Sequence, residues 1–228
     1  MELSLHRQLK ALYENESSET EAWVGEFRID VVDHAGQRLV EIQSAALAAL
    51  RGKTRQLLAD GHHVWIVKPL AARKFLVTRD KKGEEIVSRR WSPTRENLFH
   101  VFLELVHFVD VFPHPKLTLE LLLTIQEEQR VARPPRRWKG KNYRVADRLL
   151  TSIEQRYELR TVQDLRRLLP TTLPNSFTTE DLAKCAGIPR WLAQKVAYCL
   201  RKTAAVQLAG KRGHALLYEL PKRRRRAA

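Results

Sequence analysis

The segment EFRIDVVDHAGQRLVEIQ, residues 26–43, decides the fold expected of this chain. It predicts a strand, a tight turn around Gly36, and a second strand that leads into a helix. Because successive side chains of a strand point to opposite faces, Glu41 and Gln43 should share one face. Asp30 lies on the partner strand. Two acidic side chains on an apolar hairpin are costly unless a cation lies between them, and hard divalent metals prefer carboxylate oxygens.

This arrangement resembles the PD-(D/E)xK nuclease superfamily, in which an Asp on one strand is followed by Asp/Glu-x-Lys on the next strand and then by a helix. Asp30 matches the Asp, Glu41 matches the second acidic residue, and Gln43 stands in the position of the Lys. The family's proline is absent, because Ile29 precedes Asp30. Glu-x-Gln occurs in some restriction endonucleases of the superfamily. The resemblance implies an α/β fold with a restriction-endonuclease-like mixed β-sheet core and flanking helices.

The same resemblance implies Mg²⁺ or Mn²⁺ as the cofactor. Asp30 and Glu41 would be the principal metal ligands, and the backbone carbonyl of Ile42 is a candidate third ligand. A fourth acidic residue often joins such sites from the segment after the first helix. Glu21 is the favoured candidate, because it enters the strand nine residues before Asp30.

A lysine in the third motif position would orient the attacking water and stabilise negative charge. Gln43 can donate a hydrogen bond from its amide but carries no positive charge. Lys53, ten residues further along, is the candidate replacement, since it lies on the helix that follows the hairpin. The alternative is that Lys53 is an ordinary solvated helix residue.

The charge is unevenly distributed along the 228 residues. Residues 1–128 contain 17 Lys and Arg against 19 Asp and Glu, whereas residues 129–228 contain 24 against 7. The whole formal net charge of +15 therefore comes from the C-terminal 100 residues, which indicates a polyanion-binding half. The alternative is a basic surface that serves only solubility.

The two cysteines, Cys185 and Cys199, form neither a disulfide framework nor a CxxC metal site. No run of 18 apolar residues and no signal-peptide pattern is present. The sequence therefore predicts a cytoplasmic protein, and its DNA-binding character predicts association with the nucleoid.

The charge and composition predict a nuclease-like domain over 1–128, a basic Pro-rich linker over 129–145, and a nucleic-acid-binding domain over 146–228. The expected helices of the chain, besides those of the C-terminal motif, cover residues 3–13, 44–60, 96–109, 146–157 and 161–169. The expected strands outside the first hairpin, which covers residues 23–32 and 38–43, lie at 63–70, 74–78, 85–88 and 117–127.

Residues 176–220 predict a short helix, a turn, a longer helix over 190–202 and a hairpin with a basic tip. This pattern resembles the winged-helix family, and the whole chain resembles an uncharacterised bacterial group that joins such a module to a nuclease core. On the longer helix, the residues expected to face the core are Leu192, Val196, Ala197 and Leu200. Trp191 is assigned to the other faces, and the alternative is that it lies in the core. The side chains expected to contact nucleic acid are Arg190, Gln194, Lys195, Arg201 and Lys202 on the longer helix, and Lys211 and Arg212 at the hairpin tip.

Together these features predict a metal-dependent endonuclease that cleaves duplex or branched DNA in repair, recombination or defence. Double-strand cleavage by a nuclease with one site per chain would favour a homodimer. One alternative is a non-catalytic DNA-binding regulator on a decayed nuclease fold, which the Gln43 departure favours. A second alternative is an RNA endonuclease.

Overall fold

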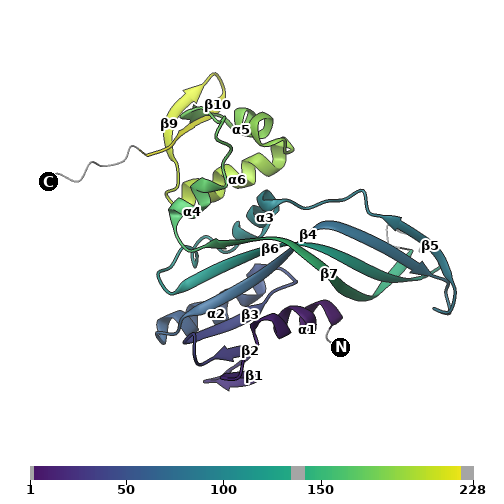
Figure 1. Ribbon diagram of the computed structural model, residues 1–228. Coiled ribbons are helices and arrows are strands. Elements are labelled where there is room, and N and C mark those ends of the chain that lie inside the picture. Colours follow the sequence, from purple (N-terminus) through teal and green to yellow (C-terminus); the bar gives the residue numbers. More distant parts are fainter. Residues whose placement is uncertain (1–2, 135–141, 222–228) are drawn as a thin grey trace.

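The computed structural model describes residues 3–134 and 142–221 and has a mixed α/β architecture (Figure 1). A large sheet has the strand order β1-β2-β3-β4-β6-β7, and β5 pairs with β4 outside this path. Its strands are β1 (Ser18–Val24), β2 (Phe27–Asp33), β3 (Arg38–Ile42), β4 (Val64–Arg79), β5 (Ile86–Trp91), β6 (Leu117–Ala132) and β7 (Tyr143–Leu159). The helices are α1 (Ser4–Lys10), α2 (Arg51–Ala59), α3 (Val101–Leu105), α4 (Val162–Arg167), α5 (Thr179–Ala186) and α6 (Arg190–Lys202).

The predicted order of strand, strand, helix and strand is confirmed around β2, β3, α2 and β4. β2 and β3 pair antiparallel, and β4 adds parallel to β3 after the crossover through α2. β4 also pairs parallel with β6, while β6 and β7 are antiparallel, so the sheet is mixed. The parallel strands are rich in Val, Ile and Leu because helices cover both faces of the sheet.

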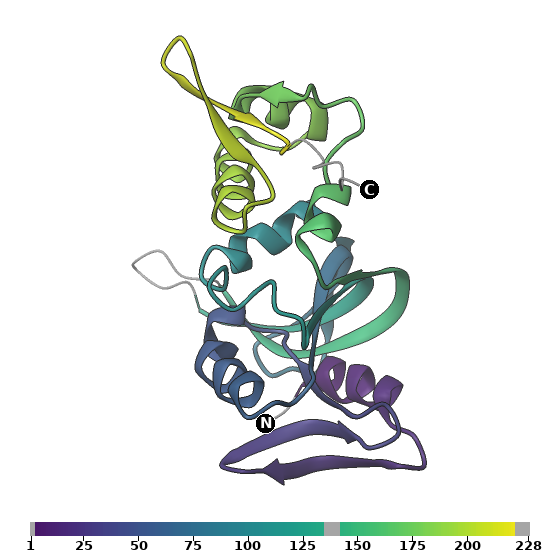
Figure 2. The ribbon, with the colours of Figure 1, turned by 90° about the vertical axis from the view of Figure 1, so that its left-hand side faces the viewer.

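The two faces of the sheet support separate apolar clusters. Figure 2 shows α1 and α2 on opposite sides of the strands. On the α1 side, Leu5, Leu9 and Tyr13 pack against a smaller group of buried strand residues, Val31, Val40, Ile42, Val67 and Leu122. The opposite face holds the larger cluster, which runs from α2 through α3 into the C-terminal helices. Each fully buried Leu or Ile of these clusters contributes roughly 2 kcal/mol by leaving water.

The first strand is shorter than predicted. A turn interrupts the expected strand over 23–32, because Gly25 has a φ of 59° that an L side chain rarely adopts. Residues 18–21, which belong to the acidic segment before Gly25, form most of the edge strand β1. An edge strand can carry many polar residues, since one of its sides faces solvent.

The predicted linker and the helix expected over 146–157 are both wrong. Residues 143–159 form β7, which pairs with β6 from Leu119↔Leu159 to Ala132↔Tyr143. The boundary expected at 129–145 therefore falls between two strands of one hairpin, and residues 135–141 of that segment lie outside the described residues.

This correction also divides the positive charge differently. Residues 129–160 contain 10 Lys and Arg against 3 Asp and Glu. Residues 161–228 contain 14 against 4. Arg130, Arg144, Arg148 and Arg156 lie on β6 and β7 of the large sheet, so the basic excess does not belong to the C-terminal unit alone.

Two predicted helices are shorter in the structure. In the segment 44–60, a 3₁₀ turn (Leu47–Leu50) precedes α2, and Ser44 does not cap a helix. In the segment 96–109, a 3₁₀ turn (Leu98–His100) precedes the five-residue α3. The strand over 117–127 and the first helix are confirmed; β6 extends to Ala132, and a 3₁₀ turn (Ala11–Tyr13) continues α1.

The C-terminal unit consists of α4, α5 and α6 with a small sheet of order β8-β10-β9. Its strands are β8 (Ser176–Phe177), β9 (Gln207–Arg212) and β10 (Ala215–Glu219). α6 packs on α3, where the Cys199 thiol lies 3.6 Å from the Phe102 carbonyl oxygen. Figures 1 and 2 place this unit and the β1–β2 hairpin at opposite ends of the molecule.

Candidate active site

Asp30 lies where β2 separates from β3. The backbone pairing of the two strands runs from Asp33↔Arg38 to Val31↔Val40 and stops before Asp30. The Asp30 carboxylate oxygen Oδ2 instead accepts a hydrogen bond of 2.7 Å from the backbone N–H of Ile42. The side chain thereby satisfies a strand donor and is held at the end of β3.

His6 of α1 reaches the same carboxylate, with its Nε2 3.2 Å from Asp30 Oδ1. The His6 side chain is half-buried, with 23 % of it exposed. Burial acts to raise the pKa of Asp30, but the contacts with His6 and the Ile42 N–H outweigh it and hold this pKa below its usual value. Asp30 is therefore a carboxylate at neutral pH.

Glu41 is almost fully buried and is paired with Lys53. Only 6 % of Glu41 is exposed, and its Oε1 accepts a hydrogen bond from the Lys53 ammonium. Burial raises the pKa of Glu41 to about 7; the Lys53 charge opposes this rise and the Asp30 charge adds to it. Asp30 and Glu41 thus interact electrostatically at one end of β3.

Lys53 is not a solvated helix residue. Its side chain is 16 % exposed, and its ammonium also donates to the Arg28 carbonyl oxygen, so it bridges β2 and β3 from α2. Gln43 is held differently, because its side-chain Nε2 donates to the Ala46 carbonyl oxygen at 2.7 Å. The structure therefore brings together Asp30, Glu41 and Lys53, while the Gln43 amide binds the loop after β3.

Glu21 is occupied by two cations. It has a φ of 55°, and its carboxylate contacts Lys10 of α1 and the Nε of Arg28, the latter at 2.9 Å. Among the described residues, these are the ion-pair partners of Glu21. Its predicted place among the metal ligands stays a prediction that would require the two ion pairs to open.

Asp30 and Glu41 are the candidate ligands of a metal ion at this end of β3. Within residues 3–134 and 142–221, no group of three or more His, Cys, Asp or Glu side chains could hold one. Asp30 and Glu41 provide two interacting carboxylates beside the main chain of Ile42. Mg²⁺ is commonly bound through one or two carboxylates, with water and substrate phosphates as the remaining ligands. The donor set fits this minimal type of site.

Lys68 is a residue that the sequence reasoning missed. It follows Val67, which pairs with Ile42 across the parallel strands β3 and β4. The Lys68 side chain is 7 % exposed, and its ammonium donates to the Ala45 carbonyl oxygen and lies 3.9 Å from Glu104. Burial lowers its pKa, and the nearby carboxylate of Glu104 partly opposes this. The signal was a lone lysine within the apolar run HVWIVKPL, residues 63–70.

The predicted contact residues of α6 are all exposed. Its buried face includes the four residues expected there, Leu192, Val196, Ala197 and Leu200. The exposed side chains include Arg190, Gln194, Lys195, Arg201 and Lys202. Trp191 is 53 % exposed, which confirms its place outside the core and excludes the alternative that it is a core residue. It shares a face of α6 with Gln194 and Lys195, three and four residues further along, which are also exposed.

The hairpin of β9 and β10 presents the other two predicted residues. Lys211 and Arg212 are both exposed. The Arg212 guanidinium lies 3.0 Å from the Asp181 carboxylate at the start of α5. Arg212 would have to leave this ion pair, or share it, to contact a phosphate.

A family model described as "Domain of unknown function (DUF8091)" matches residues 3–160. An "Uncharacterized protein" of Treponema pallidum (strain Nichols) is 29 % identical over 218 residues, which cover 95 % of this chain and 84 % of that protein. No solved structure matches the chain. In the described ranges, no helix combines the length and apolar character needed to cross a membrane.

Proposed function

We propose that this chain, which belongs to the DUF8091 family, is a metal-dependent DNA endonuclease of the PD-(D/E)xK type with a winged-helix DNA-binding unit. One observation carries the proposal: Asp30, Glu41 and Lys53 converge from β2, β3 and α2 at one end of β3. Burying an acidic side chain with a lysine is costly and rarely improves stability. Catalysis of phosphodiester hydrolysis gives a reason for keeping these charges.

In this proposal each side chain has a separate task. Asp30 and Glu41 would hold Mg²⁺ or Mn²⁺ together with water. A bound divalent ion would lower the pKa of a water molecule and stabilise charge at phosphorus. Lys53 would neutralise part of the negative charge at the site and orient the Glu41 carboxylate. His6 would position Asp30 through its contact with Oδ1.

The C-terminal unit supports the DNA-binding part of the proposal. The element order α4, β8, α5, α6, β9, β10 and the sheet order β8-β10-β9 are those expected of a winged helix. A winged helix places the second helix of its helix-turn-helix motif in the major groove of DNA. In this chain α6 would be that helix, and it exposes Arg190 and Gln194. Arg and Gln side chains are suited to base edges, whereas Lys195 and Lys202 are suited to phosphates.

Cleavage assays with matched variants test the proposal. Glu41→Ala and Asp30→Asn should each abolish Mg²⁺-dependent cleavage while DNA binding persists. Asp60→Asn is the matched control, because Asp60 is an exposed acid at the end of α2 that contacts Gln56. Cleavage by Glu41→Ala and Asp30→Asn at the rate of wild type and of the Asp60→Asn control would contradict the proposed site. Assays on duplex DNA, branched DNA and structured RNA would identify the substrate and test the RNA alternative.

The regulator is the second candidate, and one contact favours it. The Gln43 amide is hydrogen-bonded to the Ala46 carbonyl oxygen, and no positive charge occupies its position in the motif. A regulator would bind DNA with strong salt dependence and would not cleave it with Mg²⁺ or Mn²⁺. The cleavage and binding assays therefore separate the two candidates.

A further inference from the structure

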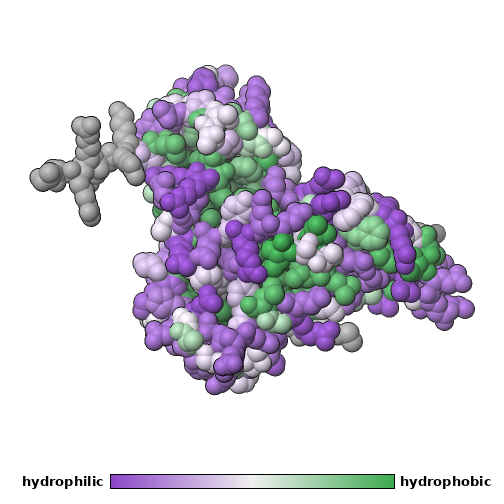
Figure 3. Space-filling view, in the orientation of Figure 1, coloured by the Kyte–Doolittle hydropathy of each residue, from purple (hydrophilic) through white to green (hydrophobic). Residues whose placement is uncertain are grey.

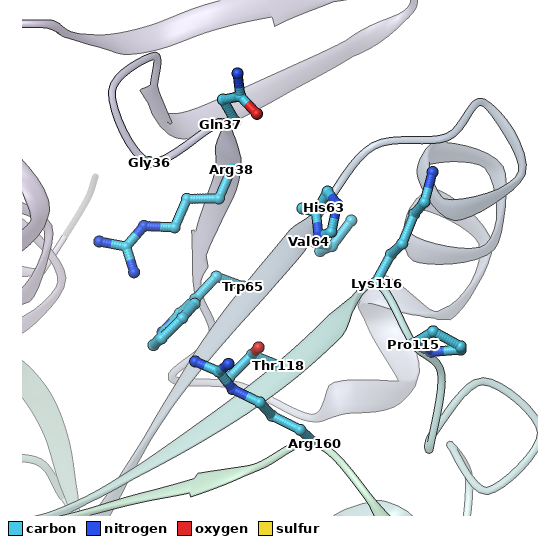
Figure 4. Close-up of a pocket in the computed structure, with 10 residues that line it drawn as sticks. All are labelled: Gly36, Gln37, Arg38, His63, Val64, Trp65, Pro115, Lys116, Thr118 and Arg160. Carbon is cyan, nitrogen blue, oxygen red and sulfur yellow. The ribbon is translucent and has the colours of Figure 1, made fainter.

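A cavity of about 400 Å³ lies at the start of the parallel strands β4 and β6 (Figure 4). It is at the opposite end of β3 from Glu41, because Arg38, the first residue of β3, lines it. Among the described residues that line it, none is acidic. The side chains that give it its chemical character are Arg38, His63, Trp65, Lys116, Thr118 and Arg160.

The indole of Trp65 lies between two guanidinium groups in Figure 4. The Cζ of Arg38 is 4.4 Å from the ring centroid, and the Cζ of Arg160 is 5.4 Å from it. The Trp65 ring is itself fixed, since its N–H donates to the buried Glu120 carboxylate at 2.7 Å. An aromatic ring that is fixed in this way orients the guanidinium groups beside it.

The two arginines keep donors available for a ligand. Arg38 uses Nε to bind Asp33 at 2.8 Å, and among the described residues its two terminal nitrogens have no hydrogen-bond partner. Arg160 binds Glu158 through one terminal nitrogen, at 2.8 Å. The Lys116 ammonium, in contrast, donates to the Gly61 carbonyl oxygen at 2.8 Å and points away from the two guanidinium groups in Figure 4.

We propose that this cavity binds a backbone phosphate of a nucleic acid. The guanidinium groups of Arg38 and Arg160 lie beside one concave surface, with no carboxylate among the described residues that line it, and they match the several oxygens of a phosphate. The choice of nucleic acid rests on the proposed function, whereas the anion site rests on the cavity alone. Arg38 lies four residues before Ile42, about 13 Å along β3, so one nucleic-acid strand can reach both ends of the strand.

The test uses the full-length protein and the ¹H–¹⁵N signal of the Trp65 indole, identified by its loss in Trp65→Phe. The probes are inorganic phosphate and a short single-stranded oligonucleotide, each at constant ionic strength set with chloride. Both should shift the signal saturably. Arg38→Ala and Arg160→Ala should each weaken binding at least tenfold, and Arg160→Lys should weaken it less. Lys81→Ala, an exposed lysine in the turn before β5, is the control and should leave binding unchanged.

Three outcomes would overturn the proposal. A shift that does not saturate, or one that persists unchanged in Arg38→Ala and Arg160→Ala, would exclude the anion site. Saturation by phosphate without any response to the oligonucleotide would exclude nucleic acid as the ligand. Repeating the titration with Asp30→Asn separates this test from catalysis, because the expected shift persists there even if cleavage is absent.

Discussion

Lys53 on α2 donates a hydrogen bond to the carboxylate of Glu41 on β3, and both side chains are largely buried. This contact joins the crossover helix to the strand that carries the second acid of the motif. It places a positive charge beside Glu41 although Gln43 occupies the usual lysine position. The proposed function depends on this pair, and several measurements follow from it.

Lys53→Met should destabilise the protein by about 3 kcal/mol at pH 8, because it leaves the Glu41 carboxylate buried without a partner. The cost should be smaller at pH 5, where Glu41 with a pKa of about 7 is already protonated in the folded protein. Urea unfolding of both proteins at the two pH values measures the difference. The same loss at pH 5 and pH 8 would show that Lys53 does not act through the charge of Glu41.

The raised pKa of Glu41 predicts a stability that falls as pH rises. Between about 4.5 and 7 the carboxyl is protonated in the folded protein and ionised in the unfolded chain, so folding takes up a proton. The loss over this range should be at most about 3 kcal/mol. Glu41→Gln should lose less stability than wild type over the same range, as measured by urea unfolding. Equal pH dependence in the two proteins would mean that the Glu41 pKa is not raised.

Moving the lysine back to its usual motif position should rescue a Lys53 variant. Lys53→Met should lower cleavage by about 10²- to 10³-fold, as loss of a charge-stabilising donor does in other enzymes. Adding Gln43→Lys should restore at least part of that loss. Gln43→Ala alone is the control, and it should cost less than tenfold because the Gln43 amide binds the loop at Ala46. No rescue in the double variant would argue that the two positions do not share one role.

The α6 surface predicts a measurable salt dependence of DNA binding. Lys195→Ala and Lys202→Ala should each lower the slope of log K against log salt by roughly 0.9 if each side chain binds one phosphate. Arg190→Ala should weaken binding by about 1 to 3 kcal/mol and relax sequence preference if it reads a base. Lys184→Ala is the control, since Lys184 is paired with Glu180 on α5. Unchanged slopes in both lysine variants would place the DNA elsewhere.

The sequence predicted the elements whose periodicity is intact. Alternation around Asp30 and Glu41 predicted β2 and β3, and the apolar run after Gly61 predicted the start of β4. The helical spacing of Leu192, Val196 and Leu200 predicted the packed face of α6. Local pattern was sufficient in these segments because each has a single buried face or is buried throughout.

β7 could not be predicted in this way. Leu149, Leu150, Ile153 and Tyr157 recur at helical spacing, yet these residues form a strand against β6. The β6–β7 pairing shifts register near Leu123, Ile125 and Gln129, and each shift disturbs the alternation of inward and outward side chains. The partner strand, and not the local pattern, determines the structure of this segment. The basic Pro-rich stretch before it consequently resembled a domain linker.

The most direct test of the central claim is cleavage of supercoiled plasmid by the purified protein with Mg²⁺, Mn²⁺ or EDTA, beside Glu41→Ala and the Asp60→Asn control. We expect metal-dependent nicking by wild type and Asp60→Asn that is absent in EDTA and in Glu41→Ala. Absence of cleavage with either metal, together with tight and salt-sensitive DNA binding, would contradict the nuclease and favour the regulator.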